Sequence, residues 1–166
     1  MRMKFVCCVI AAVSALCIGA ALDRSVSADT EFAKSELDLE AAMRLVHAAV
    51  EESRKRDLAM DIAVVDATGY LKAFARMDGA FLGSVDISQR KARTSVLFQA
   101  PTSALSGLTQ PGQPLYGLEH TNGGLVTFGG GIPLRNKDGK LIGAIGVSGS
   151  SVENDVAVAE AGVSAL

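Results

Sequence analysis

The hydrophobic and polar positions of this chain describe the same strand–turn–strand unit twice, seventy residues apart. The first unit covers 62–76, with Gly69 in its turn, and the second covers 132–148, with Gly139 at the matching position. Short apolar runs joined by a tight turn that contains glycine predict β-hairpins. The four predicted strands are 62–66, 70–76, 132–136 and 140–148.

Apolar residues at helical spacing predict a first helix over about 37–56, with Ser35 or Asp38 as its cap. The apolar stripe of this helix consists of Leu39, Met43, Val46 and Val50. We expect this stripe to cover one face of a sheet.

Further along the chain, the pattern predicts two more helices and one more strand. One helix covers 84–98, and a strand covers 125–128. The last helix begins near Ser151, where Ser150 and Glu153 have the spacing of a capping box. Five strands, joined mostly as hairpins, and three main helices predict an antiparallel sheet flanked by helices, in outline a profilin-like α/β sandwich.

The segment 99–124 has a different composition from its surroundings. Its three prolines and five glycines rule out a long regular element, although a short helical turn fits at 102–105. Irregular stretches of this length in compact domains are usually functional or disordered. The apolar Leu115 and Tyr116 favour an ordered loop that faces a ligand or an interface.

The first 28 residues have the pattern of a secretory signal peptide. Arg2 and Lys4 precede an apolar run over 5–22, and the small residues at 26–28 form a workable cleavage site. The alternative is an uncleaved membrane anchor, since eighteen apolar residues are just enough to span a bilayer. Cleavage predicts a periplasmic or extracellular protein with a polar leader over 29–35 and one domain over 36–166.

Removal of residues 1–28 changes both the cysteine content and the charge. All three cysteines lie in that segment, so a mature chain has no disulfide, thiol nucleophile, zinc–thiolate site or iron–sulfur cluster. It retains 13 Lys and Arg against 17 Asp and Glu, a net charge of about −4. The basic clusters at 54–56 and 90–93 are too small for a nucleic-acid footprint, so we expect no nucleic-acid partner.

The two histidines are the candidate metal ligands. His47 lies at the edge of the apolar stripe of the first helix, and His120 ends the long loop, beside Glu119. The structural alternative for each is an ordinary surface histidine. Two histidines far apart in sequence do not indicate a zinc site, but a single histidine can be an axial ligand of haem iron, as can tyrosine or methionine.

The strand over 143–149 has a glycine at every third position and runs directly into the helix start at Ser150 and Ser151. Glycine in a strand indicates close approach to the backbone, and free N–H groups at a helix start can hold a carboxylate or phosphate. The structural alternative is tight helix packing with ordinary capping. The chain lacks the dinucleotide fingerprint, the phosphate-loop lysine and the Gly-x-Ser-x-Gly elbow, so nucleotide-binding and serine-hydrolase functions are not supported.

The chain resembles the GlcG/HbpS haem-binding family over about residues 36–166. This resemblance implies a helix-flanked antiparallel sheet, haem binding and frequent homo-oligomers, often octamers. It also implies haem or iron handling, with a haem-degrading role, in extracytoplasmic members. Cytoplasmic relatives accompany glycolate utilisation, and a related domain ends certain corrinoid adenosyltransferases. The segments that carry the resemblance are 63–69, 75–80, 91–94, 101–105, 129–134, 142–149 and 154–162.

Because the chain has the pattern of an export signal, the haem branch of the family is favoured. We expect an exported haem-binding protein that takes part in haem or iron handling, with haem degradation or sensing as its more specific roles. Haem would lie on an apolar surface between the long loop and a helix or subunit face, with His120 or His47, in that order, as axial ligand. The groups expected to neutralise the propionates are Arg76, Arg93 or the helix start at Ser150 and Ser151.

Two other functions are consistent with the sequence. The first is an enzyme or sensor accessory module of the GlcG type that acts on a small organic acid, with Arg76 and the Ser150–Ser151 helix start as its carboxylate site. The second is a pure interaction module, for example a partner of a membrane sensor.

Overall fold

The computed structural model describes residues 36–166, so the predicted signal peptide (1–28) and polar leader (29–35) lie outside the described residues. No helix in the described part of the chain is long and apolar enough to cross a membrane. Its elements, in chain order, are α1 (Leu39–Lys55), β1 (Asp61–Asp66), β2 (Leu71–Arg76), α2 (Leu82–Phe98), α3 (Ser103–Ser106), η2 (Leu118–His120), β3 (Gly131–Arg135), β4 (Leu141–Ser148) and α4 (Val152–Val163).

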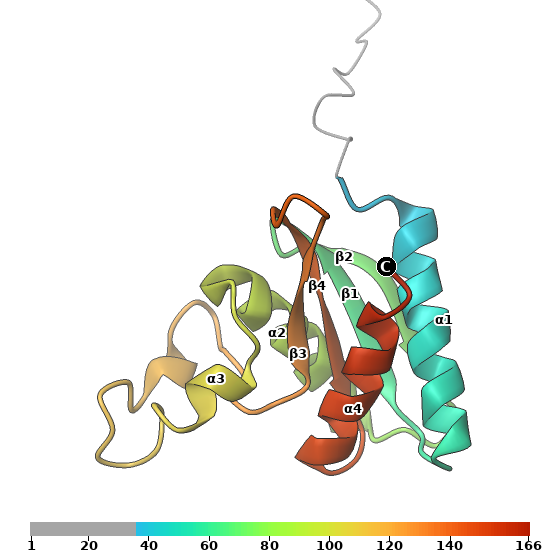
Figure 1. Ribbon diagram of the computed structural model, residues 1–166. Helices are drawn as coiled ribbons and strands as arrows, with labels where there is room; N and C mark the ends of the chain where they lie inside the picture. The colour runs from blue at the N-terminus through green and yellow to red at the C-terminus, as the bar shows by residue number, and fades with distance from the viewer. Residues whose placement is uncertain (1–35) are drawn as a thin grey trace, which may run out of the picture. The chain divides into compact units, whose positions relative to one another are not determined.

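The two predicted hairpins are confirmed. β1 pairs with β2 and β3 pairs with β4, and an antiparallel β1–β4 pairing joins the hairpins into one sheet of order β2-β1-β4-β3 (Figure 1). The same turn chemistry closes both. Asp66 accepts the N–H groups of Thr68 and Tyr70, and Asn136 accepts those of Asp138 and Lys140. The repeated sequence pattern therefore corresponds to the same hydrogen-bonded turn in both hairpins.

The sheet has four strands, not five, because the predicted strand at 125–128 does not form. Its backbone donors are bonded elsewhere: the N–H of Val126 donates to the Thr94 hydroxyl at 3.1 Å, and that of Leu125 donates to the Glu119 carbonyl. Leu125 and Val126 are thus buried against α2 without a ladder partner. The prediction of an antiparallel sheet flanked by helices is otherwise confirmed.

Helices cover both faces of the sheet. α1 and α4 pack on one face, in a core that includes Leu45, Ile145 and Val158, and α2 packs on the other face against Val65 and Ala144 (Figure 1). The glycines of β4 make the second contact possible. A Cβ on Gly146 would lie 2.1 Å from the Ser88 carbonyl oxygen, so tight helix packing accounts for this glycine.

The helix boundaries correct several details of the sequence interpretation. Asp38 caps α1 by accepting the Ala41 N–H at 2.6 Å. α2 begins at Leu82, two residues before the predicted start. α4 is capped by Ser151, which accepts the Asn154 N–H, so the predicted Ser150–Glu153 capping box is wrong by one position.

The buried stripe of α1 also differs from the prediction. Leu39 is 58% exposed and Met43 is 40% exposed, whereas the predicted Val46 is buried. Alanines fill the remaining contact with the sheet and with α4. The two helices approach closely, since a Cβ on Gly162 of α4 would lie 3.3 Å from the Leu45 carbonyl oxygen. The residues of α1 that are buried are Ala41, Ala42, Leu45, Val46, Ala49 and Ser53.

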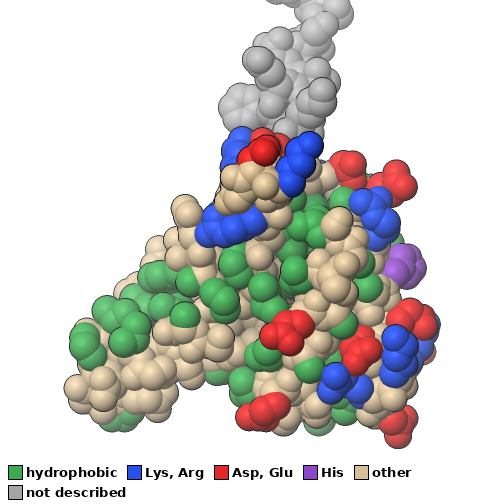
Figure 2. Space-filling view, viewed as in Figure 1, with side chains coloured by type: hydrophobic (Ala, Val, Ile, Leu, Met, Phe, Trp, Pro, Cys, Tyr) green, Lys and Arg blue, Asp and Glu red, His purple; other side chains and the backbone are tan. Residues whose placement is uncertain are grey.

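Residues 107–128 form an arm that projects from the α2 side of the sheet. It follows α3, which is the predicted short helical turn (Figure 1). Its root is closed by a hydrogen bond of 3.1 Å between the buried hydroxyls of Thr109 and Thr127. Apolar and uncharged side chains make up the visible face of the arm, whereas charges gather over the body (Figure 2). The large hydrophobic residues that the arm exposes are Leu108, Leu115, Tyr116 and Phe128.

Candidate functional site

One exposed stripe of α1 carries the first predicted ligand, His47. The residues of this α1 stripe are Leu39, Met43, His47, Val50 and Arg54, of which Val50 is half-buried against the core and the others are exposed. Their spacings of three and four residues place them on one side of the helix. His47 is exposed and lies at the middle of the stripe, with Leu39 and Met43 on one side and Arg54 at the far end.

A pocket of about 380 Å³ lies where the C-terminal end of the α1 stripe meets β2. Val50, Ala75 and Met77 give it apolar walls, Arg54 and Arg76 bring guanidinium groups to it, and Asp78 brings one carboxylate. Val50 is one helical turn after His47, so the fold brings His47 and the predicted Arg76 to the same side of the molecule. We call the stripe and this pocket together the α1–β2 groove.

His120 and Arg93 belong to a different place. His120 is exposed in η2, and Arg93 donates to the Asn122 carbonyl at 2.6 Å. Arg93 also lines a pocket of about 240 Å³ between α2 and the start of β2 at Leu71. The α1–β2 groove lies at the other end of this six-residue strand, at Arg76, about 17 Å away. The structure therefore places the predicted arginines, Arg93 and Arg76, in two separate pockets, and neither pocket is lined by a histidine.

The predicted anion site at Ser150 and Ser151 is already used by the protein itself. The Ser150 N–H donates to the Asp155 carboxylate at 3.1 Å, and the Ser151 hydroxyl accepts the Asn154 N–H at 3.3 Å. Asp155 therefore lies where the carboxylate of an organic acid would bind.

A buried ion pair that the sequence interpretation missed connects α2 to α4. Lys91 donates to Asp155 at 2.5 Å and to the Val147 carbonyl at 2.9 Å, and the exposed fractions of the two side chains are 0% and 3%. The Lys91 ammonium also lies 4.8 Å from the centre of the Phe128 ring. Burial lowers the pKa of Lys91 and raises the pKa of Asp155, and the attraction between the two charges opposes both shifts.

The packing around Lys91 explains two of the three consecutive glycines, Gly130 and Gly131. A Cβ on Gly130 would lie 2.8 Å from the Lys91 ammonium nitrogen, and a Cβ on Gly131 would lie 2.4 Å from the Lys91 carbonyl oxygen. Gly130 also has a φ of +115°, in the region that favours glycine. The sequence signal for the pair was a lysine in the middle of a helix that is buried on one side, together with an aspartate in the first turn of α4.

Asp61 is a second buried carboxyl group. It is 0% exposed, and neither of its side-chain oxygens has a hydrogen-bond partner within residues 36–166. It begins β1, directly opposite Arg76 on β2 and Ser148 on β4. Burial raises the pKa of Asp61, and the Arg76 charge opposes that shift.

We expect Asp61→Asn to raise the free energy of unfolding at pH 7 by about 1–2 kcal/mol, because it removes a buried charge without a partner. A carboxyl group whose pKa is raised in the folded state costs no stability below its unfolded value of about 3.8, and the cost develops as pH rises through the folded value. The gain should therefore shrink between pH 7 and pH 4. Urea unfolding at both pH values measures it, and an Asn variant that is less stable at both would show that Asp61 has a partner in solution.

Among the described residues, no group of three or more His, Cys, Asp or Glu side chains is placed to hold a bare metal ion. The family model described as "Haem degrading protein HbpS-like" matches residues 37–164, almost the whole described part. The chain belongs to this family. The predicted GlcG/HbpS resemblance is thereby confirmed.

Relatives of the HbpS-like chain have different overall sizes. The corrinoid adenosyltransferase PduO of Salmonella typhimurium is 42% identical over 124 residues, which are 74% of this chain but only 37% of PduO. This chain thus spans well under half the length of that relative. Protein GlcG of Escherichia coli K12 is 35% identical over 112 residues, which are 68% of this chain and 81% of GlcG.

Two solved structures resemble the fold closely. The crystal structure of a PduOC–haem complex has a TM-score of 0.72 and 40% identity, and the match covers 76% of this chain and 92% of that one. The crystal structure of HbpS has a TM-score of 0.71 and 36% identity, with coverage of 78% and 89%.

Proposed function

We propose that this protein binds haem in the α1–β2 groove. The observation that carries this proposal is the exposed α1 stripe, in which Leu39 and Met43 present apolar surface beside an exposed His47. Haem has an apolar ring, a metal that binds imidazole and two carboxylates. The groove offers matching chemistry in that order, from the apolar residues through His47 to the arginines. The PduOC–haem complex, 40% identical to this chain, supports the same ligand.

His47 is the better candidate for the axial ligand, although the sequence placed His120 first. Apolar side chains flank His47 on its own helix face, and the pocket of about 380 Å³ follows one turn later. His120 belongs to an arm whose neighbouring cations are occupied: Arg90 and Arg93 both donate to backbone carbonyls at 122–124. A bound carboxylate would have to displace these hydrogen bonds.

Arg76 is the candidate partner of a propionate. Its side chain makes no hydrogen bond or ion pair with any other residue of 36–166, whereas Arg54 donates to Glu51 at 2.6 Å. Bound haem supplies redox-active iron. The protein would hold the iron through the His47 imidazole, hold the carboxylates through Arg76 and exclude water with Met43 and Val50. Because the sequence also has the pattern of a signal peptide, we extend this proposal to haem or iron handling in the periplasm or outside the cell.

Titration of the purified mature chain with hemin tests this function. We expect a saturable shift of the Soret band at one haem per chain or per pair of chains. Arg76→Gln should weaken binding by about five- to tenfold, because it removes one partly exposed charge-assisted contact. Arg44→Gln is the matched control, since Arg44 lies on α1 outside the stripe and pairs with Glu40. The absence of any saturable shift would exclude haem as the ligand.

We further propose that the chain forms homo-oligomers through the arm. A projection that exposes large apolar side chains such as Leu108 and Tyr116, and that carries Glu119 as its one acidic or basic residue apart from His120, is typical of a surface that another chain covers. Light scattering coupled to size exclusion should give a multiple of the monomer mass, and Leu108→Asp/Tyr116→Asp should give the monomer. Leu82→Asp, an exposed leucine at the start of α2, should leave the mass unchanged. A monomeric wild-type chain would contradict this assembly.

A further inference from the structure

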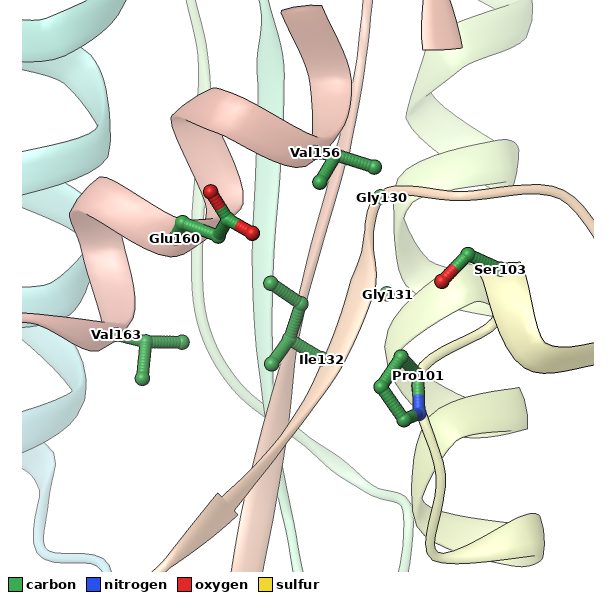
Figure 3. A pocket seen from close by; sticks show the side chains of 8 residues that line it. All are labelled: Pro101, Ser103, Gly130, Gly131, Ile132, Val156, Glu160 and Val163. Atoms are coloured by element: carbon green, nitrogen blue, oxygen red, sulfur yellow. The ribbon is translucent and has the colours of Figure 1, made fainter. Parts of the chain in front are cut away.

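A second pocket, of about 260 Å³, lies between α4, β3 and the start of α3 (Figure 3). β3 and β2 are opposite edges of the sheet, so this pocket is separate from the α1–β2 groove. Its apolar walls come from Pro101, Ile132, Val156 and Val163. We call it the α4 pocket.

The floor of the α4 pocket is held in place by the backbone. Gly131 and Thr102 exchange two hydrogen bonds of 3.0 Å, one of them through the Thr102 hydroxyl, and the Gly130 carbonyl accepts the Val147 N–H at 2.9 Å. A Cβ on Gly129 would lie 2.7 Å from Val156, so α4 rests directly on this segment. A pocket whose floor and wall are fixed in this way is formed before any ligand arrives.

Two polar side chains face the space above Ile132 from opposite sides. The Glu160 carboxylate approaches from α4 and the Ser103 hydroxyl from α3 (Figure 3). Neither side chain makes a hydrogen bond or an ion pair with another residue of 36–166, so both are free to bind a ligand.

The net charge at the α4 pocket is negative. Glu160 is the only charged residue among those that line it, and α4 contains no lysine or arginine. The nearest buried cation, Lys91, lies behind Gly130, and Asp155 neutralises it. A ligand that complements this pocket therefore has a positive hydrogen-bond donor and a short apolar body.

We propose that the α4 pocket binds a small alkylammonium compound, a primary amine whose ammonium group lies between Glu160 and Ser103 and whose hydrocarbon chain lies on Ile132 and Val156. This site is independent of haem binding, since none of its residues belongs to the α1–β2 groove.

NMR titration of the ¹⁵N-labelled mature chain with n-pentylammonium chloride tests this site. Saturable shifts are expected at the amides of Gly130, Gly131 and Glu160. Pentan-1-ol, which has the same chain without the charge, should bind at least about fivefold more weakly, and pentanoate should not bind. Glu160→Gln should lower the affinity for the amine to that for the alcohol.

Glu153→Gln is the matched control, because Glu153 is an exposed glutamate on the same helix outside the pocket. It should leave amine binding unchanged. Equal binding of amine and alcohol, unchanged amine binding by Glu160→Gln, or the absence of saturable shifts would each overturn the proposal.

Discussion

Lys91→Met is expected to lower the free energy of unfolding by about 3–5 kcal/mol, because it leaves the Asp155 carboxylate buried without its cation. The substitution also leaves the Val147 carbonyl without the Lys91 donor and removes the charge beside the Phe128 ring. Urea unfolding followed by far-UV circular dichroism measures the loss.

A matched exposed pair provides the control. Lys140 and Glu36 are also 2.5 Å apart, but their side chains are 67% and 42% exposed. Lys140→Met should therefore cost less than about 1 kcal/mol. Lys91→Met/Asp155→Asn should recover part of the loss, since the Asn side chain can still accept the Ser150 N–H and no charge remains buried. Equal losses for Lys91→Met and Lys140→Met would contradict a tightly coupled buried pair.

His47→Ala is expected to weaken hemin binding by more than about 100-fold, because the loss of a metal ligand exceeds the roughly 10–100-fold cost of losing an outer-shell partner. The variant should fold normally, since His47 is exposed on α1 and a helix tolerates alanine well. Circular dichroism checks the fold, and the position and saturation of the Soret band measure binding.

Features that depend on a few neighbouring residues could be predicted from the sequence. The two hairpins follow from the glycine-containing turns, and the Asp38 cap follows from residue type and position. The short helical turn after Pro101 could also be predicted from the residues next to it. These elements make their hydrogen bonds within a few residues of themselves, so the pattern alone indicates them.

Features that depend on distant residues could not be predicted in the same way. The segment 125–128 has the composition of a strand, but the backbone N–H of Val126 donates to the Thr94 hydroxyl, which is 32 positions away. Lys91 and Asp155 are 64 positions apart, and neither residue type indicates burial by itself. Only the packing of α2 and α4 around the glycines brings them together.

The candidate site shows the same division. The sequence identified His47, His120, Arg76 and Arg93 as residues of interest, but their grouping depends on how α1 lies along β2. The apolar character of Leu39 and Met43 predicted that both would be buried. Both are exposed, because alanines fill the contact with the sheet, and the sequence pattern does not show this. Their exposure makes the α1 stripe the favoured haem surface.

The most direct test is a parallel hemin titration of the wild-type chain, His47→Ala and His120→Ala. We predict a saturable Soret shift for the wild type and for His120→Ala, and its loss for His47→Ala. Loss in His120→Ala alone would move the iron to the arm, and retention in both variants would point to Tyr116 or Tyr70. Either result would contradict haem binding through His47 in the α1–β2 groove.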